Sequence, residues 1–167
     1  TSQNNNAVAM GVNAGFNAQG AQGVAVGNAA GYNGQGASAT AVGDSAGNTG
    51  QGAYAVAIGG SAGNASQNNY ATAVGYRAGS NSQGANATAI GVNAGYNAQG
   101  ADAVAVGNAA GCASQGLRSV AVGYNAGINA QGINATTLGY NSGKVSQGAS
   151  AVAVGVGAGE QSQGAGA

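Results

Sequence analysis

The sequence predicts an all-β fold, a parallel β-solenoid in which each 16-residue repeat forms one coil. Three observations predict it. A Gly-x-x-x-Gly-x-x-x-Gln frame recurs every 16 residues through ten copies, without insertion or deletion. Each copy carries a short run of alternating small and β-branched residues, which is typical of a strand. Each copy is also too short for a pair of helices and too rich in glycine to favour helix.

The first element of each coil is a strand at positions 1 to 4, counting Ala7 as position 1. Side chains alternate across a strand, so positions 2 and 4 share one face and the small residues at positions 1 and 3 share the other. Both faces are apolar. One face can fill the coil and the other needs cover, which predicts lateral association through this strand. The position-4 residues that we assign to core or subunit contact are Val26, Val42, Ile58, Val74, Ile90, Val106 and Val122.

The rest of the coil follows from glycine and glutamine. Glycine at positions 5 and 9 predicts a bend, a second extended segment is expected at positions 10 to 13, and a turn at positions 14 and 15 closes the coil. Like residues then stack on like at about 4.8 Å per coil, so ten coils make a rod roughly 48 Å long. Small side chains let the two walls lie close together but leave little apolar area to bury in each coil.

The invariant position 13 is interpreted as a structural ladder rather than a ligand site. Stacked amides hydrogen-bond from layer to layer, or they satisfy backbone groups of turns. The column consists of Gln19, Gln35, Gln51, Gln67, Gln83, Gln99, Gln115, Gln131, Gln147 and Gln163.

Residues 1–167 are expected to form a single continuous array, with ten full repeats over 7–166 and a partial repeat at each end. Solenoids usually end in atypical capping repeats, and neither end shows one. We therefore expect the sequence to be a window from a longer array.

Composition argues against several classes of function. Only 6 of the 167 residues are charged and the net charge is zero, which gives no electrostatic basis for binding nucleic acid or an acidic membrane. No segment reads as a membrane span. With no histidine and three scattered acids, no catalytic triad, carboxylate pair or metal cluster can be drawn, so we expect no enzyme, cofactor or metal site. Cys112 is the lone cysteine and offers no disulfide framework.

All charges and aromatic residues fall in variable positions, which we assign to the surface. Exposed tyrosines are candidate contacts for a glycan or a partner protein. Those that share a column, such as Tyr124 and Tyr140, have the alternative of stacking along the rod. The candidate surface contacts are Tyr32, Tyr54, Tyr70, Tyr76, Tyr96, Tyr124 and Tyr140.

The strand and bend residues also resemble a known family. Ala-Thr-Ala-Ile-Gly-Val-Asn-Ala at 87–94 and Ser-Val-Ala-Val-Gly-Tyr-Asn-Ala at 119–126 are similar to the head repeats of YadA-like trimeric autotransporter adhesins. The whole unit also resembles repeats in fibre proteins of large viruses and phages, although the adhesin heads use a shorter repeat. The resemblance implies a left-handed, trimeric parallel β-roll that serves as an extracellular head or fibre shaft on a cell or virion surface.

The leading functional hypothesis is therefore a structural or adhesive extracellular segment without enzymatic activity. Its expected partners are further copies of itself, as a homotrimer or lateral assembly, and a host-surface glycan or protein. One alternative is a monomeric or bundled β-solenoid filament without a specific ligand. A less favoured alternative is an ice-binding solenoid, because threonine recurs at position 2 but valine fills that column in the other six copies. The threonines are Thr40, Thr72, Thr88 and Thr136.

Overall fold

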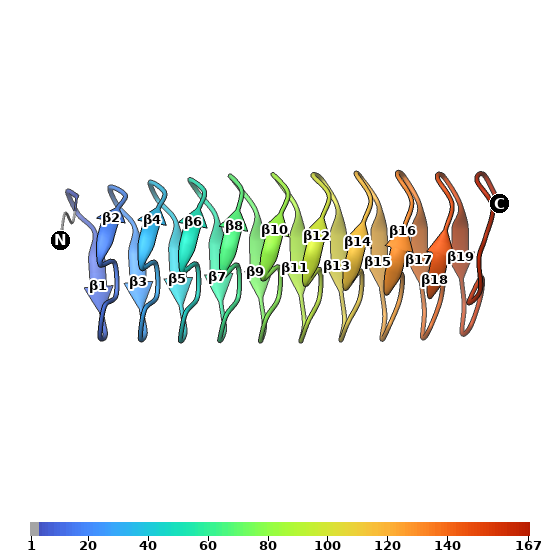
Figure 1. Cartoon of the computed structure of the whole chain (residues 1–167), viewed down its shortest axis with the longest axis horizontal. Coiled ribbons are helices and arrows are strands. Elements are labelled where there is room, and N and C mark those ends of the chain that lie inside the picture. Colours follow the sequence, from blue (N-terminus) through green and yellow to red (C-terminus); the bar gives the residue numbers. More distant parts are fainter. Residues whose placement is uncertain (1–3) are drawn as a thin grey trace.

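The chain folds as a parallel β-solenoid, as predicted from its repeat. The computed structural model describes residues 4–167, and these residues contain strands and turns but no helix (Figure 1). Each 16-residue coil contributes two short strands, one at positions 2 to 4 and one at positions 11 to 13. The strands of the first set are β1 (Val8–Met10), β3 (Val24–Val26), β5 (Thr40–Val42), β7 (Val56–Ile58), β9 (Thr72–Val74), β11 (Thr88–Ile90), β13 (Val104–Val106), β15 (Val120–Val122), β17 (Thr136–Leu138) and β19 (Val152–Val154). Those of the second set are β2 (Asn17–Gln19), β4 (Asn33–Gln35), β6 (Thr49–Gln51), β8 (Ala65–Gln67), β10 (Asn81–Gln83), β12 (Asn97–Gln99), β14 (Ala113–Gln115), β16 (Asn129–Gln131) and β18 (Val145–Gln147).

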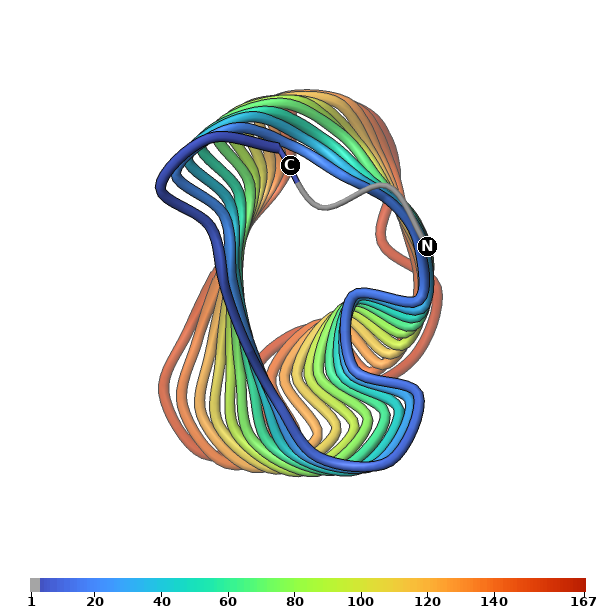
Figure 2. The same ribbon diagram turned by 90° about the vertical axis from the view of Figure 1, so that its left-hand side faces the viewer.

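The two sets of strands form two parallel sheets on opposite sides of the coil stack. The first set makes a ten-stranded sheet and the second a nine-stranded sheet, each in consecutive coil order. Every pairing joins residues 16 apart, as in Thr72↔Thr88 and Asn81↔Asn97. Seen along the rod, the coils nearly superimpose and rotate only gradually from one to the next (Figure 2). Each position of the repeat therefore becomes a straight column along the rod.

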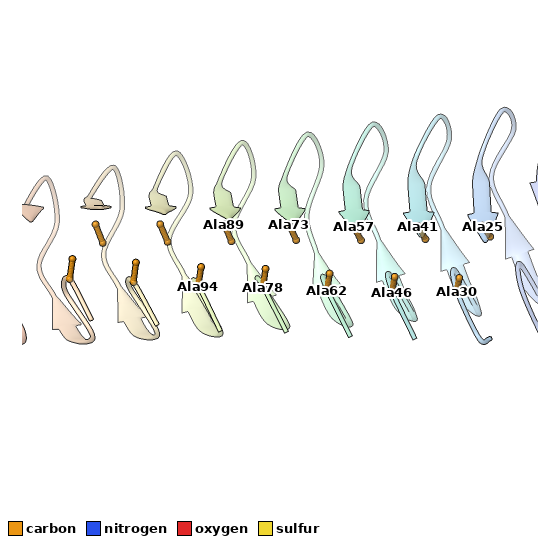
Figure 3. Packing of buried hydrophobic residues seen from close by; sticks show 14 residues of the cluster. Ala25, Ala30, Ala41, Ala46, Ala57, Ala62, Ala73, Ala78, Ala89 and Ala94 are labelled. Atoms are coloured by element: carbon orange, nitrogen blue, oxygen red, sulfur yellow. The ribbon is translucent and has the colours of Figure 1, made fainter. Parts of the chain in front are cut away.

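Alanine fills the interior. The alanines at position 3, on the ten-stranded sheet, point toward those at position 8, in the bend, as Ala25 and Ala30 do (Figure 3). Both are fully buried, and so are the alanines at position 1 in the central coils, such as Ala39. The valine and isoleucine side chains at positions 2 and 4 point outward instead. The sequence left open which strand face fills the coil, and the structure assigns the interior to alanine.

The turns differ in detail from the prediction. The second strand covers positions 11 to 13 rather than 10 to 13, and the closing turn lies at positions 15 and 16 rather than 14 and 15. Non-glycine residues at positions 7, 12 and 16 adopt left-handed backbone angles, for example Asn93 (φ 56°), Ala98 (φ 50°) and Asn86 (φ 58°). Such angles are costly for most residues, but asparagine and aspartate tolerate them. The hydrogen bonds between coils hold these turns in place, as in the 3.1 Å bond from Asn86 N to Asn69 O.

Close contact between coils explains the invariant glycine at position 5. Gly107 has φ 129°, and a Cβ atom built there would lie 2.6 Å from the carbonyl oxygen of Gly123 in the next coil. Real Cβ atoms do not approach backbone oxygens that closely. The strand spacing of the solenoid thus excludes any side chain from this column.

Polar residues that enter the interior bring their own hydrogen bonds. Thr137 replaces alanine at position 3 and is fully buried, and its hydroxyl donates to Val120 O at 3.2 Å. In the same coil, Ser142 replaces alanine at position 8 and donates to Gly139 O at 3.1 Å. A buried hydroxyl is tolerated when it is hydrogen-bonded, so the interior accepts these two polar side chains where a backbone carbonyl is within reach.

Ala105→Asp places an unpaired carboxylate between the two sheets, where Ala105 is fully buried. We expect it to destabilise the fold by ~4 kcal/mol or more, the range in which unpaired buried charges fall. Urea unfolding followed by circular dichroism measures the loss. Asn108→Asp is the matched control, because Asn108 is exposed in the same coil and aspartate already occupies its column at Asp44. Equal stability of the two variants would contradict the alanine interior.

Candidate functional site

The surface of the rod, rather than a cleft, holds the candidate site. No pocket opens anywhere in residues 4–167. The outer faces of the rod are therefore the candidate binding surfaces. The columns of the repeat divide that surface into an apolar face, a polar face, and the turn columns that carry the aromatic and charged residues.

The predicted glutamine ladder lies inside the coil rather than on its surface. Gln99 is 2% exposed, and its Nε2 donates to Thr88 O at 2.8 Å and to Ala103 O at 3.3 Å. The amide thus crosses the interior from the nine-stranded sheet and braces the backbone beside the ten-stranded sheet. The same two hydrogen bonds, to the carbonyl oxygens 11 residues earlier and 4 residues later in the chain, are made by Gln19, Gln35, Gln51, Gln67, Gln83, Gln99, Gln115, Gln131 and Gln147.

Bonds from amide to amide form only part of a ladder. They join Gln51 to Gln67 at 3.2 Å, Gln67 to Gln83 at 3.1 Å, and Gln147 to Gln163 at 3.2 Å. The main hydrogen-bond partners of these glutamines are therefore backbone carbonyl groups in their own coil and in the next coil.

The glutamine amide and the glycine at position 9 fit each other. A Cβ atom built at Gly95 would lie 2.8 Å from Oε1 of Gln99, and Gly95 has φ 53°. The carbonyl oxygen of Gln99 accepts no hydrogen bond and lies against this glycine instead. A side chain at position 9 would displace the amide, and the tight fit leaves no space for a bound ligand.

The outer side of the ten-stranded sheet is an apolar surface, which we name the valine face. It consists of the residues at positions 2 and 4 of every coil, which are valine, threonine, isoleucine, leucine or methionine and are never charged. In the central coils these side chains are half-buried, and the larger ones are more exposed, such as Ile58 at 40% and Leu138 at 46%. The predicted core or contact residues, Val26, Val42, Ile58, Val74, Ile90, Val106 and Val122, all belong to this face. None enters the interior, so subunit contact is the role that stays open to them.

The outer side of the nine-stranded sheet is polar. Exposed asparagines at position 11 hydrogen-bond from coil to coil, as in Asn17 Nδ2 to Asn33 Oδ1 at 3.1 Å and Asn81 Nδ2 to Asn97 Oδ1 at 3.0 Å. We name this surface, formed by positions 11 and 12, the amide face. The rod is therefore two-sided: one sheet presents valine, isoleucine and threonine outward, and the other presents asparagine and serine interspersed with alanine and glycine.

The tyrosines lie in three turn columns, and most of them stack on a neighbour. Ring centroids are 5.2, 5.2 and 5.4 Å apart in the parallel pairs Phe16–Tyr32, Tyr54–Tyr70 and Tyr124–Tyr140. The Arg77 guanidinium lies 5.1 Å from the ring centre of Tyr76. Tyr96 shares the position-10 column with Cys112. Ring faces that stack on each other are not available to a sugar, so a glycan would meet the outer faces and edges of these rings.

Charged and reactive side chains are dispersed. The Lys144 ammonium lies 3.3 Å from the Glu160 carboxylate, and both side chains are partly exposed. Burial raises the pKa of the Cys112 thiol, which disfavours the nucleophilic thiolate at neutral pH. Across residues 4–167, no three acidic, cysteine or histidine side chains gather to ligate a metal. The same residues include no helix with the length and hydropathy to cross a membrane.

Comparison with protein-family models, curated proteins and solved structures finds no match to this chain.

The glutamine column is tested by Gln99→Leu, which keeps the volume but removes both hydrogen bonds. Because a net hydrogen bond is worth about 1 kcal/mol, we expect a loss of ~2 kcal/mol in the free energy of unfolding. Gln99→Glu adds a pH test. A carboxyl buried among carbonyls has a raised pKa in the folded state, so its stability should be greatest below the ordinary glutamate pKa of about 4.3 and fall as pH rises. Urea unfolding at pH 4 and pH 7 measures both variants. A glutamate variant with the same stability at both values would contradict the buried position.

Proposed function

We propose that this chain is a structural and adhesive segment of an extracellular fibre or head, without enzymatic activity, that presents a repetitive surface for attachment. The observation that carries the proposal is the combination of an invariant interior and a variable exterior. Columns 5, 9 and 13 never change, whereas the aromatic and charged residues occupy the outward turn columns. This distribution suits a shaft that keeps its shape while its surface varies.

The backbone supports a mechanical role for the rod. Each coil hydrogen-bonds to the next through both sheets and through its turns, as in Gly107 N to Ile90 O at 2.8 Å and Gly111 N to Ala126 O at 2.9 Å. Force along the rod is thus shared by many parallel hydrogen bonds between neighbouring coils. The interior column of glutamine amides adds further bonds between the two sheets.

The proposed partners are further copies of the chain, as a homotrimer or another lateral assembly, and a glycan or protein on a host surface. The valine face is the surface available for self-association. The exposed aromatic columns, which include Tyr54, Tyr70 and Tyr140, are the surface available for attachment. The corresponding location is outside the cell, on a cell or virion surface.

Attachment is tested with beads that carry residues 1–167 and flow over immobilised host glycans and host-surface proteins. We expect the coated beads to be retained several-fold more than bare beads. The double variant Tyr54→Ser and Tyr70→Ser, which removes one exposed stacked pair, should lower the retention, whereas the matched change Asn97→Ser and Asn129→Ser on the amide face should not. Retention equal to that of bare beads on every surface would reject the adhesive role. X-ray scattering from the free chain in solution reports separately whether it is a rod ~48 Å long.

Ice binding is a second candidate that one observation favours. The four position-2 threonines, Thr40, Thr72, Thr88 and Thr136, lie on the valine face, outside the coil, and Thr72 pairs directly with Thr88. A flat face whose side chains repeat at the strand spacing could order water regularly. Thermal hysteresis of a concentrated solution is the test. This function predicts a measurable difference between the melting and freezing temperatures, which Thr72→Lys and Thr88→Lys abolish. The absence of any such difference would reject ice binding.

A further inference from the structure

The valine face is an apolar surface that the single chain leaves uncovered. It runs the full length of the ten-stranded sheet, from β1 to β19, and consists of two adjacent columns, position 4 with only apolar side chains and position 2 with six valines and four threonines. Soluble proteins seldom leave a continuous apolar patch of this kind open to water. The six charged residues of the chain all lie elsewhere, at positions 6, 7, 10 and 16.

The face is well suited to pack against a copy of itself. Its strands are parallel and in register, so identical or similar side chains repeat along each column, as in Val104↔Val120 and Val106↔Val122. Two such sheets can interdigitate short β-branched side chains in a dry contact, the arrangement that stabilises stacked in-register sheets. The coils rotate only gradually from one to the next, so neighbouring strands of the face lie nearly in line (Figure 2). No like charges oppose each other when two valine faces meet.

The size of the face matches the needs of a stable pair. At ~4.8 Å per coil and ~3.3 Å per residue, a surface ten coils long and about four residues wide covers ~600 Å². Two copies would bury ~1,200 Å² in total, which reaches the lower end of the range for specific protein interfaces. The borders of the face also fit an interface. Positions 6 and 16 flank it with exposed tyrosines, such as Tyr54 and Tyr124, and with charged residues, such as Asp102 and Arg118.

The opposite side of the rod limits the assembly. The amide face carries exposed asparagines that hydrogen-bond to one another along the rod. Sideways growth needs two adhesive faces, so a rod that associates through the valine face alone forms a closed oligomer. This property argues against the open bundling of rods.

We propose that two copies of this chain pair through their valine faces, in an isologous contact that buries positions 2 and 4 of both copies. The inference rests on the lateral association in the proposed function and names its contact surface and its stoichiometry. A two-fold pair sets the two valine faces against each other, so that each covers the other.

The molar mass in solution tests the pair directly. Light scattering over a wide concentration range should give the mass of two chains for residues 1–167. The double variant Ile58→Lys and Ile90→Lys, which places charges on the valine face, should raise the dimer Kd by about a hundredfold or more. The control double variant Asn97→Lys and Asn129→Lys adds the same charge to the amide face, where both asparagines are exposed, and should remain a dimer. A milder variant, Val74→Thr and Val106→Thr, keeps the side-chain shape and should weaken the pair less.

Circular dichroism and X-ray scattering of each variant report whether the rod itself is retained. A rod of one-chain mass in the unmodified protein would overturn the pair and leave the proposed structural role intact. A three-chain mass, or pairing unaffected by lysines on the valine face, would also overturn it. A chain that shows no rod in scattering would overturn the pair and the structural proposal together.

Discussion

The narrow space between the two sheets is the constraint on which the rest of the molecule depends. It admits alanine from one sheet, alanine from the bend and one glutamine amide per coil, and little else. Gly95 is required because the Gln99 amide lies against it, and Gly107 is required because the next coil passes within contact of its Cα. An insertion in any coil would misalign these columns, which accounts for the strict 16-residue period. The stability of the fold therefore comes mainly from repeated backbone hydrogen bonds and amide braces, since alanine buries little apolar area.

The same constraint sends the larger apolar side chains outward. Alanine occupies position 3 in every coil except that of Thr137, so the strand turns its small side chains inward and presents positions 2 and 4 to the exterior. The opposite sheet carries asparagine and serine among alanine and glycine on its outer side, and the rod becomes two-sided. This two-sidedness connects the interior to the proposed function, because a shaft with a single apolar face has one direction in which to associate. The turn columns then carry the tyrosines and charges that distinguish one coil from the next.

Much of this architecture could be predicted from the sequence. The solenoid, the two strands of each coil to within one residue, and the stacking of like on like all followed from the 16-residue frame. The inward face of the strand did not, because alanine and valine are both apolar and alternation alone does not give the direction. The left-handed backbone angles at positions 7 and 16, in the turns, and at position 12, within the second strand, were also missed, although residues such as Asn86 and Asn93 were a signal for those in the turns. The glutamine column was assigned a structural role, but its main partners, the backbone carbonyls across the interior, depend on a sheet separation that no sequence pattern reports. The resemblance to adhesin heads, with its trimer, stays a prediction.

The rise per repeat is the most direct test of this account. Spin labels on cysteines at positions 22, 86 and 150 of the chain would lie in one column, with Cys112→Ser removing the native thiol and unlabelled chain added to dilute any pair. The account predicts ~19 Å between labels at 86 and 150, four coils apart, and ~38 Å between labels at 22 and 150, eight coils apart. Distances in the ratio of two to one, with narrow distributions, would establish one 16-residue repeat per strand spacing along a straight rod. Broad distributions, or distances that do not grow in proportion to the number of repeats, would contradict it.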